Sequence, residues 1–519
     1  MYSATGRSGA IAAPHAAAAR TGLSVLQDGG SAIEAMVAAA ATIAVTYPHM
    51  NGIGGDGFWL VSRADGTVTG ISAAGRAAAL ATAARYAEGI PARGPQAALT
   101  VPTAIAGWQA ALDLMPTRMP LSRLLRDAIT WAGEGSPVTE SQSRHTSAKL
   151  PDLIGQPGFA EIFAPSGTAP EAGVILANPA LAQTLDRMAR LGLRDFYDGE
   201  TAAQHGAWLA EVGSPLRAGD LAAARAEVVM PLSAQIRSGT LWNMPPPTQG
   251  AASLMILGVL DRLGGVVSDG TDLVHRVVEA TKPAFRLRND LIGDPDHMTV
   301  RPGDWLTDAA LAAMAGGIDL TRAAPWPDPP RDGGTIWMGA SDRDGTMVSY
   351  IQSVFWEFGS GIVCPATGVL FQNRGAAFSL AEGPNVLRPG ARPFHTLNPA
   401  MARLSDGRRI AYGTMGGEGQ PQTQAAIFAR HVMLGQPLGQ AIDAPRWLLG
   451  RTWGEDSTTL KLEARFGGVI DDLAALGHET EAIADYSDLT GHAGAVVLHP
   501  DGTVEAAHDP RADGGGMAW

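Results

Sequence analysis

The sequence predicts an α/β layered sandwich, in which helices cover strands that pair mainly antiparallel. Residues 335–341 and 346–353 alternate like β-strands and flank an Asp-Gly turn signal, a pattern typical of a β-hairpin. Helical patterns are mixed with such strands along the chain. This mixture favours a layered sandwich over a doubly wound parallel sheet. Gly and Pro are spread throughout, and no repeat, low-complexity block or interdomain linker interrupts the 519 residues.

An early helix is the most clearly marked element. Ser31 and Glu34 have the spacing of a capping box, and residues 35–41 continue with good helix formers. A glycine-rich turn and an apolar FWLV strand follow this helix. Further along we expect amphipathic helices at 121–131 and 273–290, the second kinked or divided by Pro283, a strand-turn pattern at 361–373, and helices at 425–434 and 467–476.

Charge and cysteine content argue against several classes of function. A formal net charge of -13 does not fit a nucleic-acid footprint, which needs clustered Lys and Arg. Cys364 is the only cysteine, so the chain can form no internal disulfide and no cysteine-based zinc site. The N-terminal segment lacks a signal-peptide pattern, and the apolar run 35–45 is too short to span a bilayer. We therefore expect a soluble, cytoplasmic protein that binds neither nucleic acid nor membrane.

Familiar catalytic and cofactor motifs are weak or missing. Gly52, Gly54 and Gly57 match GxGxxG, but a helix precedes them and a strand follows, the reverse of a dinucleotide-binding loop. A tight turn with close backbone packing is the favoured interpretation. The chain contains no P-loop, no HExxH and no GxSxG, and its 12 histidines include no pair at a metal-ligand spacing. We expect no metal and no organic cofactor.

The string Gly333-Gly334-Thr335 at the start of the hairpin has two interpretations. A threonine hydroxyl is a poor nucleophile unless a base lies within hydrogen-bond reach, and one such base is the residue's own α-amine, with a pKa of about 8. That amine exists only if the bond between Gly334 and Thr335 is cut, and glycines allow the strained backbone that a self-cleaving bond needs. The alternative is an ordinary loop that leads into a strand, and the residues alone favour it.

Segments along nearly the whole chain resemble the γ-glutamyltranspeptidase family of N-terminal nucleophile hydrolases. They include GGSAIEAMVAAA, MNGIGGDGFWLV, MPPPTQGAASLMIL and HRVVEATKPAF, and later GTMVSYIQSVFWEFGSGIV, TGVLFQNRGAAFSL, RPFHTLNPAM, GTMGGEGQPQ and HDPRADGG. The resemblance implies a four-layer αββα sandwich made from a precursor that cleaves itself before a threonine. Aligned without gaps to the downstream Phe358-Gly359-Ser360-Gly361, that threonine is Thr335. Cleavage would leave a large chain, 1–334, and a small chain, 335–519, as one structural unit.

The same resemblance implies catalytic roles for four residues. Thr335 corresponds to the nucleophile, with its liberated amine as general base. Ser353 stands where the family has a threonine whose hydroxyl assists the nucleophile. Gly416 and Gly417 match the glycines whose backbone N–H groups form the oxyanion hole.

The residues that hold the substrate's α-amino and α-carboxylate groups in the family are changed here. The family's aspartate, asparagine, glutamine and serine pair correspond to Ala377, Phe355, Arg374 and His395-Thr396, and its carboxylate-binding arginine falls at Ala74, two residues before Arg76. A substrate ammonium group would lose its carboxylate partner in such a site.

An arginine and a histidine without an acid suit a substrate that is anionic but not zwitterionic. We expect Arg374, His395 and Thr396 to bind its carboxylate, with Arg76 and Phe355 beside them; the alternative for Arg374 is a structural ion pair. Within the family, the chain looks most like the branch that contains oxamate amidohydrolase. The expected reaction is therefore the hydrolysis of oxamate to oxalate and ammonia.

Three other functions stay open at this point. The first two are a γ-glutamyl hydrolase or transpeptidase and a cephalosporin-type acylase, each with altered substrate recognition. The third is an unprocessed, non-catalytic homologue. As partners we expect a small-molecule amide substrate and the association of the two processed chains, either as one heterodimer or as a dimer of heterodimers.

Overall fold

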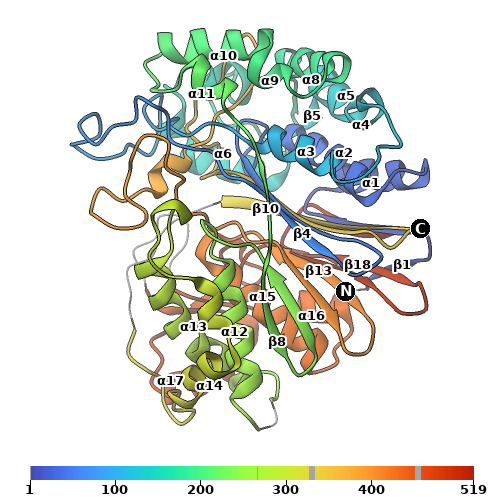
Figure 1. Ribbon diagram of the computed structural model, residues 1–519, viewed down its shortest axis with the longest axis vertical. Coiled ribbons are helices and arrows are strands. Elements are labelled where there is room, and N and C mark those ends of the chain that lie inside the picture. Colours follow the sequence, from blue (N-terminus) through green and yellow to red (C-terminus); the bar gives the residue numbers. More distant parts are fainter. Residues whose placement is uncertain (1, 266, 327–333, 451–457) are drawn as a thin grey trace.

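Two seven-stranded sheets lie face to face and carry helices on their outer faces (Figure 1). The computed structural model describes residues 2–265, 267–326, 334–450 and 458–519. Strand β10 (Gly334–Asp342) of the first sheet packs on β13 (Arg409–Thr414) and β17 (Ala493–Leu498) of the second. The result is a four-layer αββα sandwich, which confirms the expected fold.

The first sheet is built around the predicted hairpin, β10 and β11 (Met347–Phe355). Its order is β19-β2-β10-β11-β3-β4-β7, and neighbouring strands are antiparallel throughout. All residues of β11 and β3 are buried, because helices cover one face and the second sheet covers the other. The remaining strands are β2 (Gly9–Ala13), β3 (Asp56–Ser62), β4 (Val68–Ala73), β7 (Glu227–Val229) and β19 (Gly515–Ala518).

The second sheet has the order β1-β18-β17-β13-β12-β9-β8 and is also antiparallel. Trp337 of β10 fills the space between the sheets, and a Cβ added to Gly413 of β13 would lie only 2.2 Å from its ring. The other strands of this sheet are β1 (Ala4–Gly6), β8 (Leu232–Ile236), β9 (Gly239–Asn243), β12 (Ala400–Leu404) and β18 (Val504–His508). Two small sheets comprise β14 (Trp447–Leu449), β15 (Leu460–Glu463) and β16 (Thr480–Ile483), and β5 (Ser136–Pro137) and β6 (Ile175–Leu176).

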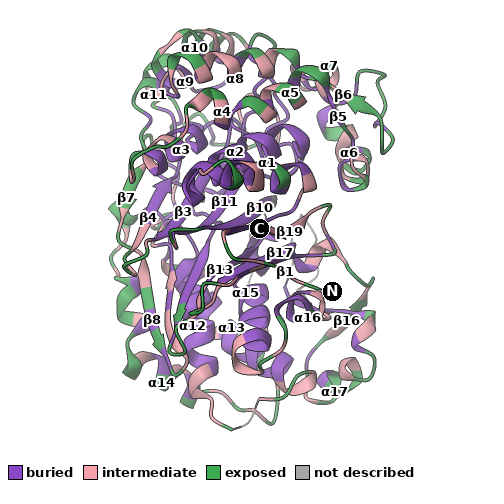
Figure 2. Ribbon diagram, turned by 90° about the vertical axis from the view of Figure 1, so that its right-hand side faces the viewer, coloured by how far each residue is buried: buried purple, intermediate pink, exposed green. Residues whose placement is uncertain are grey.

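Figure 2 shows that buried residues gather on the sheets and on the helices that touch them, whereas outer helices such as α10 expose one face. On the side of the first sheet lie α1 (Ala16–Gln27), α2 (Ala32–Thr46), α3 (Ala104–Leu112), α4 (Leu121–Leu124), α5 (Arg126–Glu134), α6 (Glu140–Leu153), α7 (Phe159–Phe163), α8 (Pro179–Leu191), α9 (Asp195–Asp198), α10 (Glu200–Glu211) and α11 (Ala218–Ala222). On the side of the second lie α12 (Gly250–Arg262), α13 (Thr271–Leu291), α14 (Asp308–Gly316), α15 (Gln420–Phe428), α16 (Leu438–Asp443) and α17 (Val469–Ala475).

Most of the predicted elements are present. Helix α2 begins after Ser31, and both bonds of its capping box to Glu34 form. The predicted helix at 121–131 is divided at Leu125 into α4 and α5. Of the kink or division expected at Pro283, the division is wrong, because α13 runs through this residue as one helix packed against α12 and α15. Residues 361–373 form no strand; they make isolated bridges between Val363 and Leu370 and between Phe371 and Gly54.

The glycine-rich turn before β3 packs tightly against the backbone, as predicted. A Cβ on Gly54 would lie 2.0 Å from the carbonyl oxygen of Leu370, and one on Gly55 would lie 2.0 Å from that of Ser353. Neither position has room for a larger residue. Within the described part of the chain, no helix is both long and apolar enough to cross a membrane.

Candidate active site

Thr335 is fully buried at the start of β10. Its hydroxyl donates to Ser353 Oγ across the hairpin at 3.3 Å, and the same Oγ accepts from the backbone N–H of Phe355 at 2.8 Å. The pairing register shifts between Gly334 and Ile336, so Thr335 lies at a β-bulge, a feature that re-aims side chains. Phe355, opposite Gly334, has a φ of 83°, which non-glycine residues rarely adopt. The expected cleavage site is thus an irregular end of the hairpin; Gly333 lies outside the described residues.

Asp56, the first residue of β3, pairs with Ser353 of β11. Residues directly opposite in antiparallel strands point to the same face, so Asp56 shares the face of the sheet that carries Ser353. Its Oδ1 accepts hydrogen bonds from the Gly75 N–H at 3.1 Å, the Thr103 hydroxyl at 2.7 Å and the Gln372 amide at 3.1 Å, whereas Oδ2 has no partner among the described residues. Burial raises the pKa of the Asp56 carboxyl to about 6, against the opposing effect of the Thr103 hydrogen bond.

Arg374 is also fully buried, in a short 3-10 turn. Its Cζ lies 4.0 Å from the centroid of the Phe355 ring, and Nε, Nη1 and Nη2 have no hydrogen-bond partner within the described ranges. Burial lowers the pKa of Arg374 to about 9, although the charge of Asp56 opposes this change. A buried cation without acceptors is costly, so the site is suited to an anion that supplies them.

His395 lies between these two charged groups. Its Nε2 is 3.5 Å from Asp56 Oδ2, and its ring packs edge-on against Phe58 with the centroids 4.9 Å apart. Burial, together with the charge of Arg374, lowers the pKa of His395 well below its usual value, so the ring is neutral at pH 7. Neither ring nitrogen makes a hydrogen bond to a described residue, and the same is true of the neighbouring Thr396 hydroxyl.

Gly416 and Gly417 form a turn directly after β13, with φ values of 117° and 52°. The carbonyl of Gly417 accepts from Gln249 Nε2 at 2.9 Å, and this amide also donates to the carbonyl of Thr396 at 2.7 Å. Arg288 donates to Gln249 Oε1 at 2.8 Å. A hydrogen bond from the N–H of Gly416 or Gly417 to another described residue is absent. Two rigidly held N–H groups of this kind could stabilise an oxyanion.

One chain of contacts joins most of the predicted site residues. It runs from Thr335 through Ser353 to Asp56, then to His395, and through Thr396 and Gln249 to Gly417. Arg374 joins it through Phe355. The structure does not bring Arg76 into this group.

Arg76 instead lines a more exposed cavity of about 390 Å³, to which Thr103 also contributes. Its guanidinium contacts Glu227 at 3.3 Å and Asp296 at 3.4 Å and donates to the carbonyl of Gly390 at 2.9 Å. These acids already occupy the donors that a substrate carboxylate would need.

Sequence reasoning missed Asp56 and Gln249, and the expectation that this site contains no acid is wrong. Asp56 stands in MNGIGGDGFWLV, where its position beside a glycine turn was the only local signal. Its proximity to Arg374 and His395 depends on long-range strand pairing, which no local pattern reveals.

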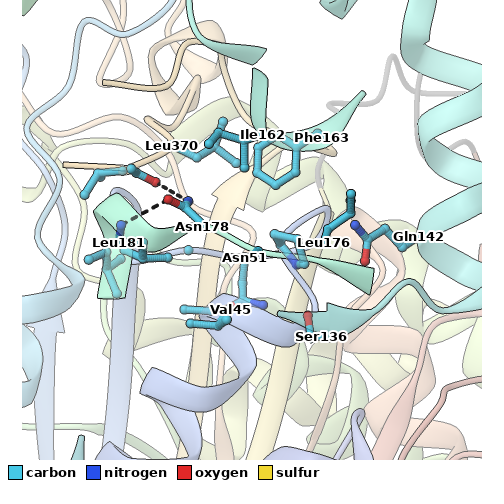
Figure 3. Close-up of a pocket in the computed structure, with 17 residues that line it drawn as sticks. Val45, Asn51, Ser136, Gln142, Ile162, Phe163, Leu176, Asn178, Leu181 and Leu370 are labelled. Carbon is cyan, nitrogen blue, oxygen red and sulfur yellow. Dashed lines mark hydrogen bonds between the residues drawn. The ribbon is translucent and has the colours of Figure 1, made fainter. Parts of the chain in front are cut away.

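The hollow drawn in Figure 3 is lined in part by the glycine-rich turn and has a volume of about 40 Å³. The side chain of Asn178 donates to the carbonyl of Gly368 at 2.9 Å and accepts from the Leu181 N–H at 3.0 Å. This amide is therefore satisfied, and none of the predicted site residues lines the hollow.

A possible metal-binding group lies in another part of the molecule. Ligand atoms of His275, Glu279 and His478 lie within 4.8 Å of one another. The two imidazoles already share a 2.7 Å hydrogen bond, and Glu279 accepts from the Lys282 ammonium at 2.5 Å and from the Ala324 N–H at 3.1 Å. The buried ammonium would repel a cation, so these contacts are better explained as a polar network within the core.

A four-layer αββα sandwich of two antiparallel sheets is the architecture of the N-terminal nucleophile hydrolases, which are amide-hydrolysing enzymes. The sequence profile of the gamma-glutamyltranspeptidase family matches residues 18–519, and the chain belongs to this family.

Three relatives agree with this assignment. The chain is 52% identical to an oxamate amidohydrolase proenzyme of Klebsiella pneumoniae, over 98% of both chains. It is 37% identical to the glutathione hydrolase-like YwrD proenzyme of Bacillus subtilis, over 97% of both. The crystal structure of a cephalosporin acylase from Bacillus halodurans superposes with a TM-score of 0.92 at 32% identity, covering 100% of this chain and 97% of the other. The chain is therefore an N-terminal nucleophile amidohydrolase.

Proposed function

We propose that the chain is a self-processing N-terminal threonine amidohydrolase for a small amide whose carboxylate adjoins the scissile carbonyl, with oxamate as the best candidate. The main support for this substrate is Arg374, because its buried guanidinium meets no hydrogen-bond acceptor among the described residues. The planar fork of a guanidinium matches a carboxylate. The 52% identity to a relative named oxamate amidohydrolase proenzyme supports the same choice.

Processing would come first. In the proposed reaction, Thr335 Oγ attacks the carbonyl of Gly334, the peptide bond becomes an ester, and water hydrolyses that ester. The products are a large chain, 1–334, and a small chain, 335–519, whose new α-amine lies on the nucleophile itself. The bulge at Thr335 and the unusual φ of Phe355 fit such a site. The relatives from Klebsiella and Bacillus are both named proenzymes, which agrees with a cleaved precursor.

Catalysis then follows as acyl transfer. The α-amine accepts the proton of Thr335 Oγ as the oxygen attacks the amide carbon, while Ser353, whose Oγ lies 3.3 Å away, keeps the nucleophile oriented. The N–H groups of Gly416 and Gly417 stabilise the oxyanion. The nitrogen leaves as ammonia with the proton from the amine, and water releases the acyl group as a second carboxylate. For oxamate the products are oxalate and ammonia.

The proposed substrate is tested by measuring the ammonia that purified, processed enzyme releases from small amides. Oxamate should be hydrolysed efficiently, whereas oxamide, which has the same amide but no carboxylate, should react poorly. A chromogenic γ-glutamyl anilide and a cephalosporin acylase substrate test the two related activities. Efficient turnover of either, without turnover of oxamate, would overturn the proposed substrate and leave the amidohydrolase class intact.

A denaturing gel tests the processing step on the same sample. The wild type should give two bands that sum to the full mass, with a threonine at the new N-terminus by mass spectrometry. Thr335→Ala should give one band and no activity, and Thr335→Ser should still be cut. A wild type that stays uncut yet hydrolyses amide would contradict the threonine mechanism.

A further inference from the structure

The Asp56 carboxylate is asymmetric. Oδ1 accepts three hydrogen bonds from groups held by the fold, namely Gly75, Thr103 and Gln372. Oδ2 makes none within the described residues, although the side chain is fully buried. Buried carboxylate oxygens are normally satisfied, and the three fixed donors prevent the carboxyl from exchanging its oxygens. Oδ2 is therefore the atom that remains for a ligand.

The position of Oδ2 is close to the proposed reaction centre. Strand β3 neighbours β11, so Asp56 is one strand spacing, about 5 Å, from Ser353, which in turn touches Thr335. On its other side Oδ2 meets His395 Nε2 at 3.5 Å, and the charge of Arg374 acts on it. The carboxylate is thus close both to the nucleophile's strand pair and to the candidate anion-binding arginine.

We propose that Asp56 is a specificity-determining residue whose Oδ2 accepts a hydrogen bond from the N–H of the scissile amide. The proposal rests on the proposed function, because it assumes that Arg374 holds the substrate carboxylate and Thr335 attacks the amide carbon. It explains why an acid stands beside a site for an anion: the acid recognises the other end of the same small molecule.

The same contact distinguishes substrate from product. In the amide, the nitrogen is uncharged and carries hydrogens that Oδ2 can accept. After hydrolysis that nitrogen has left as ammonia, and a second carboxylate takes its place. Oδ2 attracts the first group and repels the second, so Asp56 favours entry of the amide and release of the dianion.

Asp56→Asn is the decisive variant. Because three donors hold an oxygen at the Oδ1 position, the new carboxamide must turn its NH₂ group to the position of Oδ2. The NH₂ group then faces the N–H of the substrate amide and weakens substrate binding. The same NH₂ group can donate to the product carboxylate and therefore strengthens product binding. We expect kcat/KM for oxamate and the Ki of oxalate each to fall at least about tenfold. Asp342→Asn, at the far end of β10, is the matched control and should leave both constants within about twofold.

Other results overturn the inference in recognisable ways. If Asp56 only balances the charge of Arg374, its loss will tighten the binding of both anions. If Asp56 only supports the fold, oxamate and oxalate will both bind less well to the variant. Unchanged values of kcat/KM for oxamate and Ki of oxalate also contradict the proposal. A processed wild type that releases no ammonia from oxamate overturns the proposed function, and this inference with it.

The pH dependence of the wild type gives a second measurement that does not depend on the variant's folding or processing. Burial raises the pKa of Asp56 to about 6, and the groups facing it are Arg374, His395, Tyr197 and Tyr350, of which only the arginine is charged near neutrality. As the pH rises through 6, kcat/KM for oxamate should increase while oxalate inhibition weakens. Profiles that move in parallel overturn the proposal. In Asp56→Asn the step near pH 6 should disappear, while any step due to the Thr335 amine remains.

Discussion

Arg374 keeps a positive charge in the interior without a hydrogen-bonded partner among the described residues. Its pKa of about 9 leaves it protonated at pH 7, so the protein bears the cost of desolvation. Stacking on Phe355 recovers part of that cost, since an arginine over an aromatic ring gains on the order of 1–2 kcal/mol. A buried guanidinium without hydrogen-bond acceptors destabilises the fold, and such local conflicts are expected at functional sites.

Arg374→Met should separate these two effects. We expect kcat/KM for oxamate to fall about 100-fold or more, mainly through KM, because a buried charge contact is worth about 2–5 kcal/mol. The melting temperature should rise, because the variant no longer buries a guanidinium that lacks hydrogen-bond acceptors. Arg403→Met, which removes an exposed arginine that also stacks on a ring, that of Trp242, is the matched control. Unchanged kinetics would exclude Arg374 as a substrate-binding residue, and a lowered melting temperature in the same variant would assign it a structural role.

Gly416 supplies a second residue-scale prediction. Its φ of 117° disfavours any side chain, and a Cβ there would lie 3.2 Å from Cα of Gly491. Gly416→Ala should therefore displace the turn and lower kcat by about 100- to 1,000-fold, equivalent to ~3–4 kcal/mol, with little change in KM. Gly435→Ala shares the strain of a positive φ but has open space around it, and it should leave kcat unchanged. A loss confined to KM would argue against an oxyanion role.

The predictability of these residues depends on how far apart in sequence their partners lie. Thr335, Ser353 and the Gly416–Gly417 pair stand in contiguous motifs that could be recognised from sequence. Asp56 enters the site only through the pairing of β3 with β11 and through its contact with a distant histidine. Local patterns carry no such information.

At the scale of elements, the hairpin was predictable because alternation and an Asp-Gly turn are local signals. The bulge at Thr335 was not, since it depends on how the strand end meets its neighbours. The continuity of α13 through Pro283 is a similar case. Helix propensity argues for a break there, but contacts with α12 and α15 hold the helix in one piece.

Trp337 packs the hairpin of the first sheet against the second sheet. Its ring lies against glycines of three strands, where a Cβ on Gly413, Gly494 or Gly339 would approach to 2.2, 2.5 or 2.7 Å. Gly413→Ala should therefore destabilise the protein by about 1–3 kcal/mol through overpacking. Thermal unfolding measures this loss, and the double variant with Trp337→Leu should recover part of it because the two changes are in contact. Gly468→Ala, with nothing within 4 Å, is the control.

At the scale of the whole molecule, both sheets combine strands from either side of the proposed cleavage site. In the first sheet, β10 pairs with β2, β11 with β3 and β19 with β2. In the second, β12 pairs with β9 and β18 with β1. The contact between 1–334 and 335–519 is therefore made of backbone hydrogen bonds and buried apolar side chains, which salt screens only weakly.

The two processed chains should consequently remain together until the protein unfolds. We expect them to co-elute in size-exclusion chromatography at high salt and to unfold in one thermal transition. Cleavage also makes unfolding a dissociation, so the melting temperature of the processed enzyme should rise with protein concentration, because association favours the folded state by mass action. Uncut Thr335→Ala is the control, and its melting temperature should be independent of concentration. Release of the small chain before the main transition would contradict this account, since no sheet could keep its strand order after losing strands from its centre.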